Sequence, residues 1–181
     1  DQLKELALHS EIKLILEPES KNTLPAITLA CSRIQEKFKN PIVSVFPSDH
    51  KISDREEFIN IWSDAIKVAK KDFFTLIGIT PSYPSEAYGY IEPSNKIINL
   101  NSKKSSYIVR KFTEKPKFEL AKQYMNEGYL WNAGMFIFKF EVFSSLLEKY
   151  QKDLFEKFMP SIKPKDINNV YPSLKSESID N

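Results

Sequence analysis

Glycine, cysteine and histidine are scarce in this chain, and each shortage excludes a kind of site. The 181 residues include four glycines, and no two of them lie close enough to form a glycine-rich loop that cradles phosphates. The single cysteine, Cys31, excludes an internal disulfide and a zinc site built on cysteines. The two histidines, His9 and His50, give little support to a zinc site of any other composition.

Long apolar runs and a large net charge are also missing. No apolar stretch approaches the length of a membrane span, and no signal peptide opens the chain. The formal net charge of +2 is too small to indicate binding to nucleic acid or to an anionic membrane. With 41% hydrophobic and 28% charged residues, the chain suffices for one packed domain. We therefore expect a globular, cytoplasmic protein.

Short apolar runs alternate with helical segments in the first half of the chain. The runs at 12–16, 42–46 and 73–79 are predicted to be strands, because they are short and nearly all apolar. A helix is predicted over 25–38, where Pro25 suits the first turn. An amphipathic helix capped by Asp54 is predicted over 54–69. This alternation predicts an α/β fold with a mostly parallel sheet and helices on both faces.

The second half of the chain mixes shorter elements. The predicted elements are strands at 88–92, 96–100, 107–112 and 135–138 and helices at 118–127 and 141–150. Residues 159–177 carry three prolines and are expected to be irregular or weakly helical. Helical spacing at residues 1–9 and the lack of a terminator near residue 181 indicate an excerpt of a longer protein.

The segment Pro47-Ser48-Asp49-His50 follows the run 42–46 directly. Ligands of α/β folds bind beyond the carboxyl ends of parallel strands, so Asp49 is placed to hold a hard cation. Mg²⁺ takes one or two carboxylates and leaves its other positions to water and phosphates. The alternative is that Ser48 and Asp49 form a turn before the next helix. A hydrolytic triad is a poor hypothesis, because three consecutive side chains do not line up as nucleophile, base and orienting group.

A polar loop follows the run 12–16 in the same way. Asn22 and Thr23 precede Pro25 and are typical of a helix cap. The functional alternative is recognition of a base, because the carboxylate of Glu17 accepts hydrogen bonds only and guanine offers two donors on its pairing edge.

Two further motifs lie at the ends of predicted strands. Glu114 and Lys115 are either a solvated charge pair or a site where the lysine binds phosphate and the carboxylate accepts from sugar hydroxyls. Asn132, in the segment 131–134, either belongs to a turn beside a buried tryptophan or bonds the hydroxyls of a ligand.

Six segments, in this order, resemble the bacterial mannose-1-phosphate guanylyltransferases, also called GDP-mannose pyrophosphorylases. The matching stretches are 15–18 with 22–23 and 25–26, Pro47-Ser48-Asp49-His50, Tyr88-Gly89-Tyr90-Ile91, Glu114-Lys115-Pro116, 131–136 and Ser178-Ile179-Asp180. The resemblance implies a Rossmann-like nucleotidyltransferase that makes GDP-mannose and pyrophosphate from GTP and mannose 1-phosphate with Mg²⁺. The sugar phosphate would attack the α-phosphorus of GTP in line, without a covalent intermediate.

The resemblance also implies a role for each matching residue. It implies metal binding by Asp49 and Asp180, with Asp49 and Lys115 as the catalytic residues and Lys115 at the sugar phosphate. The implied sugar-binding residues are Gly89, Glu114 and Asn132. The implied nucleotide-binding residues are Glu17, Asn22, Thr23, Pro47 and Ser48.

The chain departs from the family pattern at several places. Lys21 replaces an arginine and Leu24 an alanine, and Ser85-Glu86-Ala87 replaces Glu-Thr-Gly, which leaves the sugar contacts of that loop open. The family's glycine-rich triphosphate loop has no counterpart. We therefore expect residues 1–181 to be part of one nucleotidyltransferase domain, without its glycine-rich unit and its C-terminal remainder, and inactive alone.

Three alternatives stay open. One is a bifunctional protein with mannose-6-phosphate isomerase activity in a C-terminal cupin domain, and another is a non-catalytic homologue that binds sugar nucleotides. The third is a transferase for another base or sugar. The expected partners are the two substrates, without nucleic acid or membrane; the sequence does not determine the oligomeric state, and a homodimer is one hypothesis.

Overall fold

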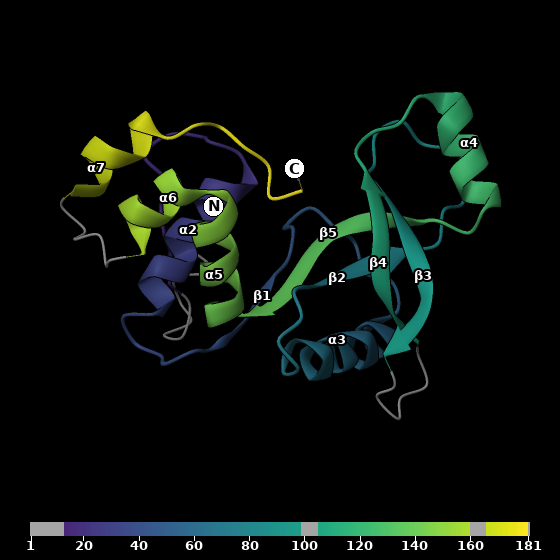
Figure 1. Ribbon diagram of the computed structural model, residues 1–181, viewed down its shortest axis with the longest axis horizontal. Coiled ribbons are helices and arrows are strands. Elements are labelled where there is room, and N and C mark those ends of the chain that lie inside the picture. Colours follow the sequence, from purple (N-terminus) through teal and green to yellow (C-terminus); the bar gives the residue numbers. More distant parts are fainter. Residues whose placement is uncertain (1–12, 99–104, 160–165, 181) are drawn as a thin grey trace.

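The computed structural model describes residues 13–98, 105–159 and 166–180, and β5 runs through its middle (Figure 1). In chain order its elements are α2 (Thr23–Ile34), β1 (Ile42–Val45), α3 (Arg55–Ala69), β2 (Thr75–Ile79), β3 (Tyr90–Ile98), β4 (Ser106–Thr113), α4 (Phe118–Asn126), β5 (Leu130–Lys139), α5 (Phe140–Tyr150), α6 (Lys152–Phe158), α7 (Ile167–Val170) and the 3₁₀ helix η2 (Tyr171–Ser173). The helices α2, α5, α6 and α7 gather on one side of Figure 1, and the β3–β4 hairpin with α4 lies on the other.

The sheet is built around β5. One edge of β5 pairs with β1, where Ile42 lies opposite Lys139, and further along with β3, where Tyr90 lies opposite Trp131. The other edge pairs with β2, and β4 extends the sheet beyond β3. The α/β content is therefore confirmed.

The mostly parallel arrangement is not what the described strands show, because every pair among them is antiparallel. β1 and β2 run in the same direction, but β5 lies between them and runs the opposite way. A continuous apolar run indicates that both faces of a strand are covered, but it does not indicate the direction of the strand.

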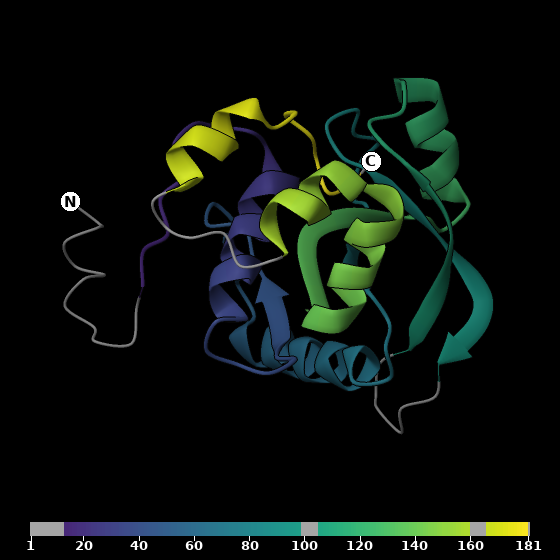
Figure 2. The same ribbon diagram turned by 60° about the vertical axis from the view of Figure 1, so that its left-hand side comes forward.

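Helices cover both faces of β5, as expected. Side chains alternate between the faces of a strand, and Phe136 and Phe138 pack in one cluster with α2, α5 and α6. Ile137, between them, packs against Ala65 and Ala69 of α3. Figure 2 shows the light green helices α5 and α6 in front of β5, with the blue helix α3 along the bottom of the view.

Most of the predicted elements are confirmed with shifted bounds. Asp54 accepts a hydrogen bond from the Glu57 amide (2.9 Å) and caps α3 as expected. The predicted strands 88–92 and 96–100 are one strand, β3, whose pairing to β4 shifts in register at Pro93, a residue without an amide proton. The weakly helical tail is confirmed by the short helices α7 and η2.

The prediction of a strand at 12–16 is wrong for the described residues 13–16, which have no regular structure. Their apolar side chains are exposed, that of Leu16 by 75%. None of the pairings among the described strands includes this segment, so its β-propensity has no partner strand to act on. The helix predicted at 1–9, with His9, and residues 99–100 lie outside the described residues. No helix in the described ranges has the length and apolar character needed to span a membrane.

Candidate active site

The last described residues bring the two halves of the molecule together. They lead from the helices toward β5 and the end of β4 (Figure 1). There the Asn132 side-chain amide donates to Asp180 Oδ1 (2.6 Å), and the Ser178 hydroxyl donates to Asp180 Oδ2 (2.9 Å). Asn132 and Asp180, which the sequence predicted as sugar and metal ligands, are therefore direct neighbours.

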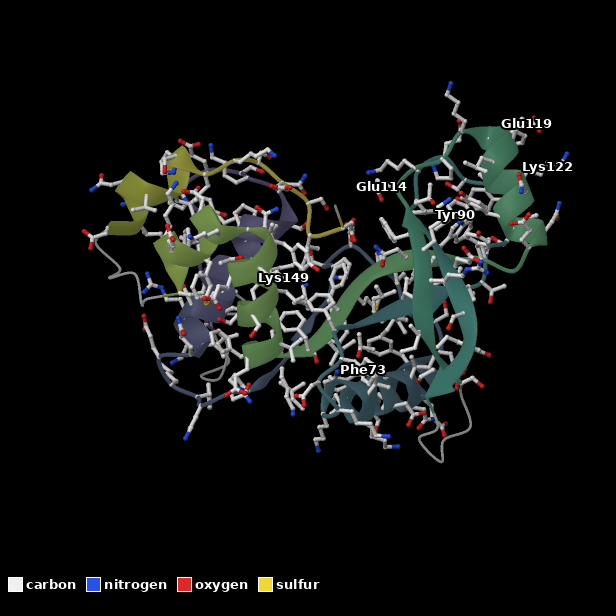
Figure 3. All side chains as sticks on the ribbon, viewed as in Figure 1. Phe73, Tyr90, Glu114, Glu119, Lys122 and Lys149 are labelled. Atoms are coloured by element: carbon white, nitrogen blue, oxygen red, sulfur yellow. The ribbon has the colours of Figure 1, made fainter. Side chains whose placement is uncertain are left out.

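Lys115 and Glu114 lie at the end of β4, close to Asp180. The Lys115 ammonium donates to Glu114 Oε1 (2.6 Å), and the two side chains are 61% and 35% exposed. This hydrogen bond and the charge of Glu114, with a smaller contribution from the charge of Asp180, raise the pKa of Lys115. Figure 3 shows Glu114 on the side of the hairpin that faces the C-terminal segment. Lys115 is thus a cation beside two carboxylates, accessible to an anionic ligand.

Gly89 connects this corner to β5. Its carbonyl accepts a hydrogen bond from the Asn132 backbone amide (2.8 Å). A Cβ atom at Gly89 would lie 2.5 Å from Phe112 Cζ and 2.8 Å from Glu114 Oε2, so no larger residue fits without moving a ring and a carboxylate. The absence of a side chain at this position therefore lets Glu114 lie against the start of β3.

An irregular stretch of β5 after Asn132 connects the site to the loop after β1. Gly134 has a φ of 64°, and its amide donates to Asn132 Oδ1 (3.1 Å). A Cβ atom at Gly134 would lie 3.5 Å from Pro47 Cγ, which places Pro47 against this part of β5. Ser48 and Asp49 follow as exposed residues. The tryptophan next to Asn132 is buried, as predicted, but the predicted turn is wrong, because residues 131–134 belong to β5.

The N-terminus of α2 holds the C-terminal segment. The Asn22 side chain accepts from the Thr23 amide (2.8 Å), so the cap interpretation is confirmed for Asn22. Thr23 Oγ1 accepts from the Ile179 amide (3.0 Å) and lies 3.2 Å from Ser178 Oγ, within hydrogen-bond distance. Thr23 thus contacts the residues that carry Asp180.

Glu17 lies apart from this group of contacts. One of its carboxylate oxygens accepts a hydrogen bond from the hydroxyl of Tyr171, a fully buried residue. Burial and the hydrogen bond to Glu17 raise the pKa of Tyr171 above its ordinary value. The structure therefore shows a structural contact for Glu17 and leaves its predicted role at the base untested.

The residues that differ from the family pattern build the loop before β3. Ser85 donates its backbone amide to the Tyr90 hydroxyl (2.9 Å), and its own hydroxyl accepts from the Ala87 amide (3.2 Å). Glu86 accepts from the Phe118 amide (3.0 Å) at the start of α4. These side chains stabilise the loop that leads to Gly89.

The donor set is compatible with a hard cation. Among the described residues no group of three or more histidine, cysteine and acidic side chains gathers to hold a metal. Mg²⁺ does not need one, since one or two carboxylates and substrate phosphates complete its shell. Asp180 is a half-buried carboxylate beside Asn132, and Asp49 lies on the loop whose Pro47 contacts β5 at Gly134.

Comparison with known proteins agrees with this arrangement. Residues 1–173 match the family model described as nucleotidyl transferase. The chain belongs to the nucleotidyl transferase family. The predicted resemblance is also confirmed. The chain is 38% identical over 141 residues to a mannose-1-phosphate guanylyltransferase of Salmonella montevideo. This alignment covers 77% of the chain and 29% of the relative. The chain spans about a third of the length of the curated relatives it matches.

Two solved structures share the nucleotidyl transferase fold seen here. A structure described as mannose-1-phosphate geranyltransferase from Thermus thermophilus matches with a TM-score of 0.86 and 26% identity, covering 96% of this chain and 50% of the other. One described as mannose-6-phosphate isomerase from Helicobacter pylori matches with a TM-score of 0.75 and 30% identity, covering 98% of this chain and 71% of the other.

The sequence did not single out two residues that contact predicted site residues. Ser178 was part of a matching segment but received no role, and Tyr171 was not singled out. The contact of Tyr171 with Glu17 spans 154 positions, so no local spacing could reveal it. Ser178 offered one signal, because it lies two residues before the predicted metal ligand.

Proposed function

We propose that this chain is part of a mannose-1-phosphate guanylyltransferase, which makes GDP-mannose and pyrophosphate from GTP and mannose 1-phosphate. The observation that carries the proposal is the contact of Asp180 with Asn132 beside Lys115. Three distant segments supply these residues, and the motif around each one points to the same active site. The similarity to relatives named for this activity supports the same conclusion.

Lys115 would hold the phosphate of mannose 1-phosphate. Its ammonium is exposed and charged at neutral pH, because Glu114 and Asp180 raise its pKa. A phosphate oxygen then forms a bond to the α-phosphorus of GTP as the bond to the β-phosphate oxygen breaks, and pyrophosphate leaves. No general base is needed, since the attacking phosphate is already ionised; catalysis rests on positioning and charge neutralisation.

Asn132, Glu114 and Gly89 would bind the sugar. Asn132 uses one amide proton on Asp180 and one acceptor position on the Gly134 amide, which leaves one donor and one acceptor for hydroxyls. Glu114 keeps a second carboxylate oxygen beside its contact with Lys115. The bare backbone of Gly89 allows close approach of a ring.

The segments on the other side of the site would bind the nucleotide. Tyr171 occupies one oxygen of Glu17, and the other would accept from the donors of guanine. Asn22, Thr23, Pro47 and Ser48 would line the path from the base to the phosphates.

Asp49 and Asp180 would hold Mg²⁺, which when bound neutralises phosphate charge and orients the reacting groups. The relatives' names and the family support nucleotide and sugar-phosphate substrates; GTP and Mg²⁺ are the finer points of the proposal. A mostly parallel Rossmann-like sheet in the whole domain, a homodimer and a cytoplasmic location complete the hypothesis.

The test is pyrophosphate release by the full-length protein. We expect release with GTP and mannose 1-phosphate, and at least tenfold slower release when another nucleoside triphosphate or sugar phosphate replaces either substrate. Faster release with another pair would reassign the base or the sugar. Binding of GDP-mannose without any release would instead identify a non-catalytic homologue.

A second activity is favoured by one observation. The Helicobacter pylori structure that matches nearly the whole chain is described as mannose-6-phosphate isomerase. We propose that a protein carrying this chain also isomerises mannose 6-phosphate, at a site outside residues 1–181. Adding mannose 6-phosphate to the same preparation and measuring ketose formation tests this, and absence of ketose would reject it.

A further inference from the structure

We propose that Ser178 is a positioning residue that sets the orientation of the Asp180 carboxylate toward its ligand. The inference rests on the proposed function, because it concerns how Asp180 serves that site. Nothing in the sequence pattern assigned a role to Ser178, and its contacts in the structure supply one.

The hydrogen bonds of Ser178 run in one direction. Ser178 has a single hydroxyl proton, and the carboxylate of Asp180, 2.9 Å away, can only accept it. Ser178 Oγ also lies 3.2 Å from Thr23 Oγ1. Because the Ser178 proton is used on Asp180, Thr23 must be the donor in that contact. The order of donation is therefore Thr23 to Ser178 to Asp180.

Ser178 itself is held in place on both sides. The backbone on its N-terminal side is fixed by two hydrogen bonds of Glu177, whose amide donates to the Lys21 carbonyl (3.1 Å) and whose carbonyl accepts from the Leu24 amide (3.1 Å). On its C-terminal side the Ile179 amide donates to Thr23 (3.0 Å). Ser178 thus transmits the position of α2 to Asp180.

The two oxygens of Asp180 have different partners. Ser178 occupies one lone pair of Oδ2, and Asn132, held on β5, occupies one lone pair of Oδ1. Two donors from different elements fix the plane of the carboxylate, and each oxygen keeps a free lone pair for a ligand. With Ser178 removed, Asn132 alone would allow the carboxylate to turn about its Cβ–Cγ bond. Partners that orient a ligating group in this way typically change metal affinity or activity by about tenfold to a hundredfold.

The experiment compares Ser178→Ala, Ser178→Thr and the wild-type full-length protein, with Mn²⁺ alone as the probe of the metal site. Free Mn²⁺ is followed by electron paramagnetic resonance, and pyrophosphate release gives kcat and KM. We expect Ser178→Ala to bind Mn²⁺ about tenfold to a hundredfold more weakly and to lose a similar factor in kcat, with KM for mannose 1-phosphate unchanged. Ser178→Thr keeps the hydroxyl and should restore both values.

Ser173→Ala is the matched control. Ser173 lies in the same terminal part of the chain and donates to the Val170 carbonyl (2.7 Å), so the change removes a similar hydrogen bond away from Asp180. We expect it to match the wild type in Mn²⁺ affinity and kcat, with a melting temperature close to that of Ser178→Ala.

Three results would overturn the inference. They are wild-type Mn²⁺ affinity and kcat in Ser178→Ala, an equal loss in Ser173→Ala, and failure of Ser178→Thr to restore binding. Absence of Mn²⁺ binding by the wild type would reject the metal assignment and the positioning role together. If Mn²⁺ binding depends on Ser178 but the wild type releases no pyrophosphate, the proposed function fails and the positioning role stands.

Discussion

At the scale of single residues, Asp49 is the predicted metal ligand whose surroundings constrain it least. It is exposed on the loop after β1, so the carboxylate can serve the site without supporting the fold. We expect Asp49→Ala to abolish pyrophosphate release while the free energy of unfolding changes by about 0.5 kcal/mol or less. Urea unfolding and the release assay measure the two effects.

The control for Asp49 is Asp153→Ala. Asp153 is also an exposed aspartate, paired with Lys157 on α6 at 2.8 Å, outside the segments that carry the proposed site. Its replacement should leave the activity unchanged. Near-normal activity of Asp49→Ala would contradict the metal assignment of this residue.

For Lys115 we expect an effect on KM, because its charge would bind the substrate already in the ground state. Loss of one charge-assisted hydrogen bond costs about 1.5–3 kcal/mol, so Lys115→Gln should raise KM for mannose 1-phosphate by about tenfold to a hundredfold. Since Glu114 and Asp180 raise the pKa of Lys115, the wild-type KM should stay constant between about pH 7 and pH 9. Lys122→Gln on α4, whose side chain points away from Glu114 in Figure 3, is the control. An equal KM in both variants would remove Lys115 from the phosphate site.

At the scale of elements, the 3₁₀ helix η2 is tied to the loop before α2 by the hydrogen bond from Tyr171 to Glu17. Burial and this hydrogen bond raise the pKa of Tyr171, so the fold retains a proton that the unfolded chain releases near pH 10. The stabilisation is therefore complete below about pH 10 and is lost as the pH rises through the folded-state pKa. Tyr171→Phe should cost about 0.5–1.5 kcal/mol at pH 8, and this difference from the wild type should shrink above about pH 10.

Urea unfolding at pH 8 and above pH 10 tests this prediction. Tyr150→Phe is the control, because the Tyr150 side chain is 66% exposed and its replacement should change little at either pH. A difference between Tyr171→Phe and wild type that stays constant with pH would show that ionisation of Tyr171 does not contribute.

The strands and their pairing differ in how far the sequence could predict them. The predictions of strands at 42–46 and 73–79 were correct. Each of these strands pairs with β5 along one edge, and helices cover the faces of the sheet. The strand predicted at the similarly apolar run 12–16 was wrong for residues 13–16. A strand needs the edge of a partner strand, and a local pattern does not show whether one is available. The antiparallel pairing of the described strands depends in the same way on distant segments. The register between β3 and β5 places Trp131 opposite Tyr90 and thereby Asn132 beside Gly89. This register depends on two segments that are distant in the sequence.

The site shows the same limit. The sequence identified Asn132 and Asp180 separately, through the motifs around them, but their contact spans 48 positions and depends on the path of the whole C-terminal segment. Asn22 shows the converse case, since a cap is a local feature and was predicted from three neighbouring residues.

At the scale of the whole molecule, the candidate site joins two separate cores. One core packs α2, α5 and α6 on β1 and β5, and the other packs α4 on the start of β3 and β5. Asp180 approaches from the first part, and Asn132, Gly89 and Glu114 belong to the second or to the strand between them. A ligand that contacts both sides would therefore stabilise the entire molecule against unfolding.

This arrangement predicts a ligand-dependent melting temperature. A ligand that binds the folded state alone stabilises it by about 2.7 kcal/mol at a hundredfold excess over its Kd. For a domain of this size, that corresponds to a rise of about 5–10 °C. We expect GDP-mannose with Mg²⁺ to produce this rise in the full-length protein, and UDP-glucose at equal concentration to produce at most a small part of it. Asn132→Ala removes a contact to Asp180 and, in the proposed site, a contact to the sugar, so it should lose most of the rise. Equal rises with both nucleotide sugars, or a full rise in Asn132→Ala, would mean that the ligand does not bind between the two cores in the proposed way.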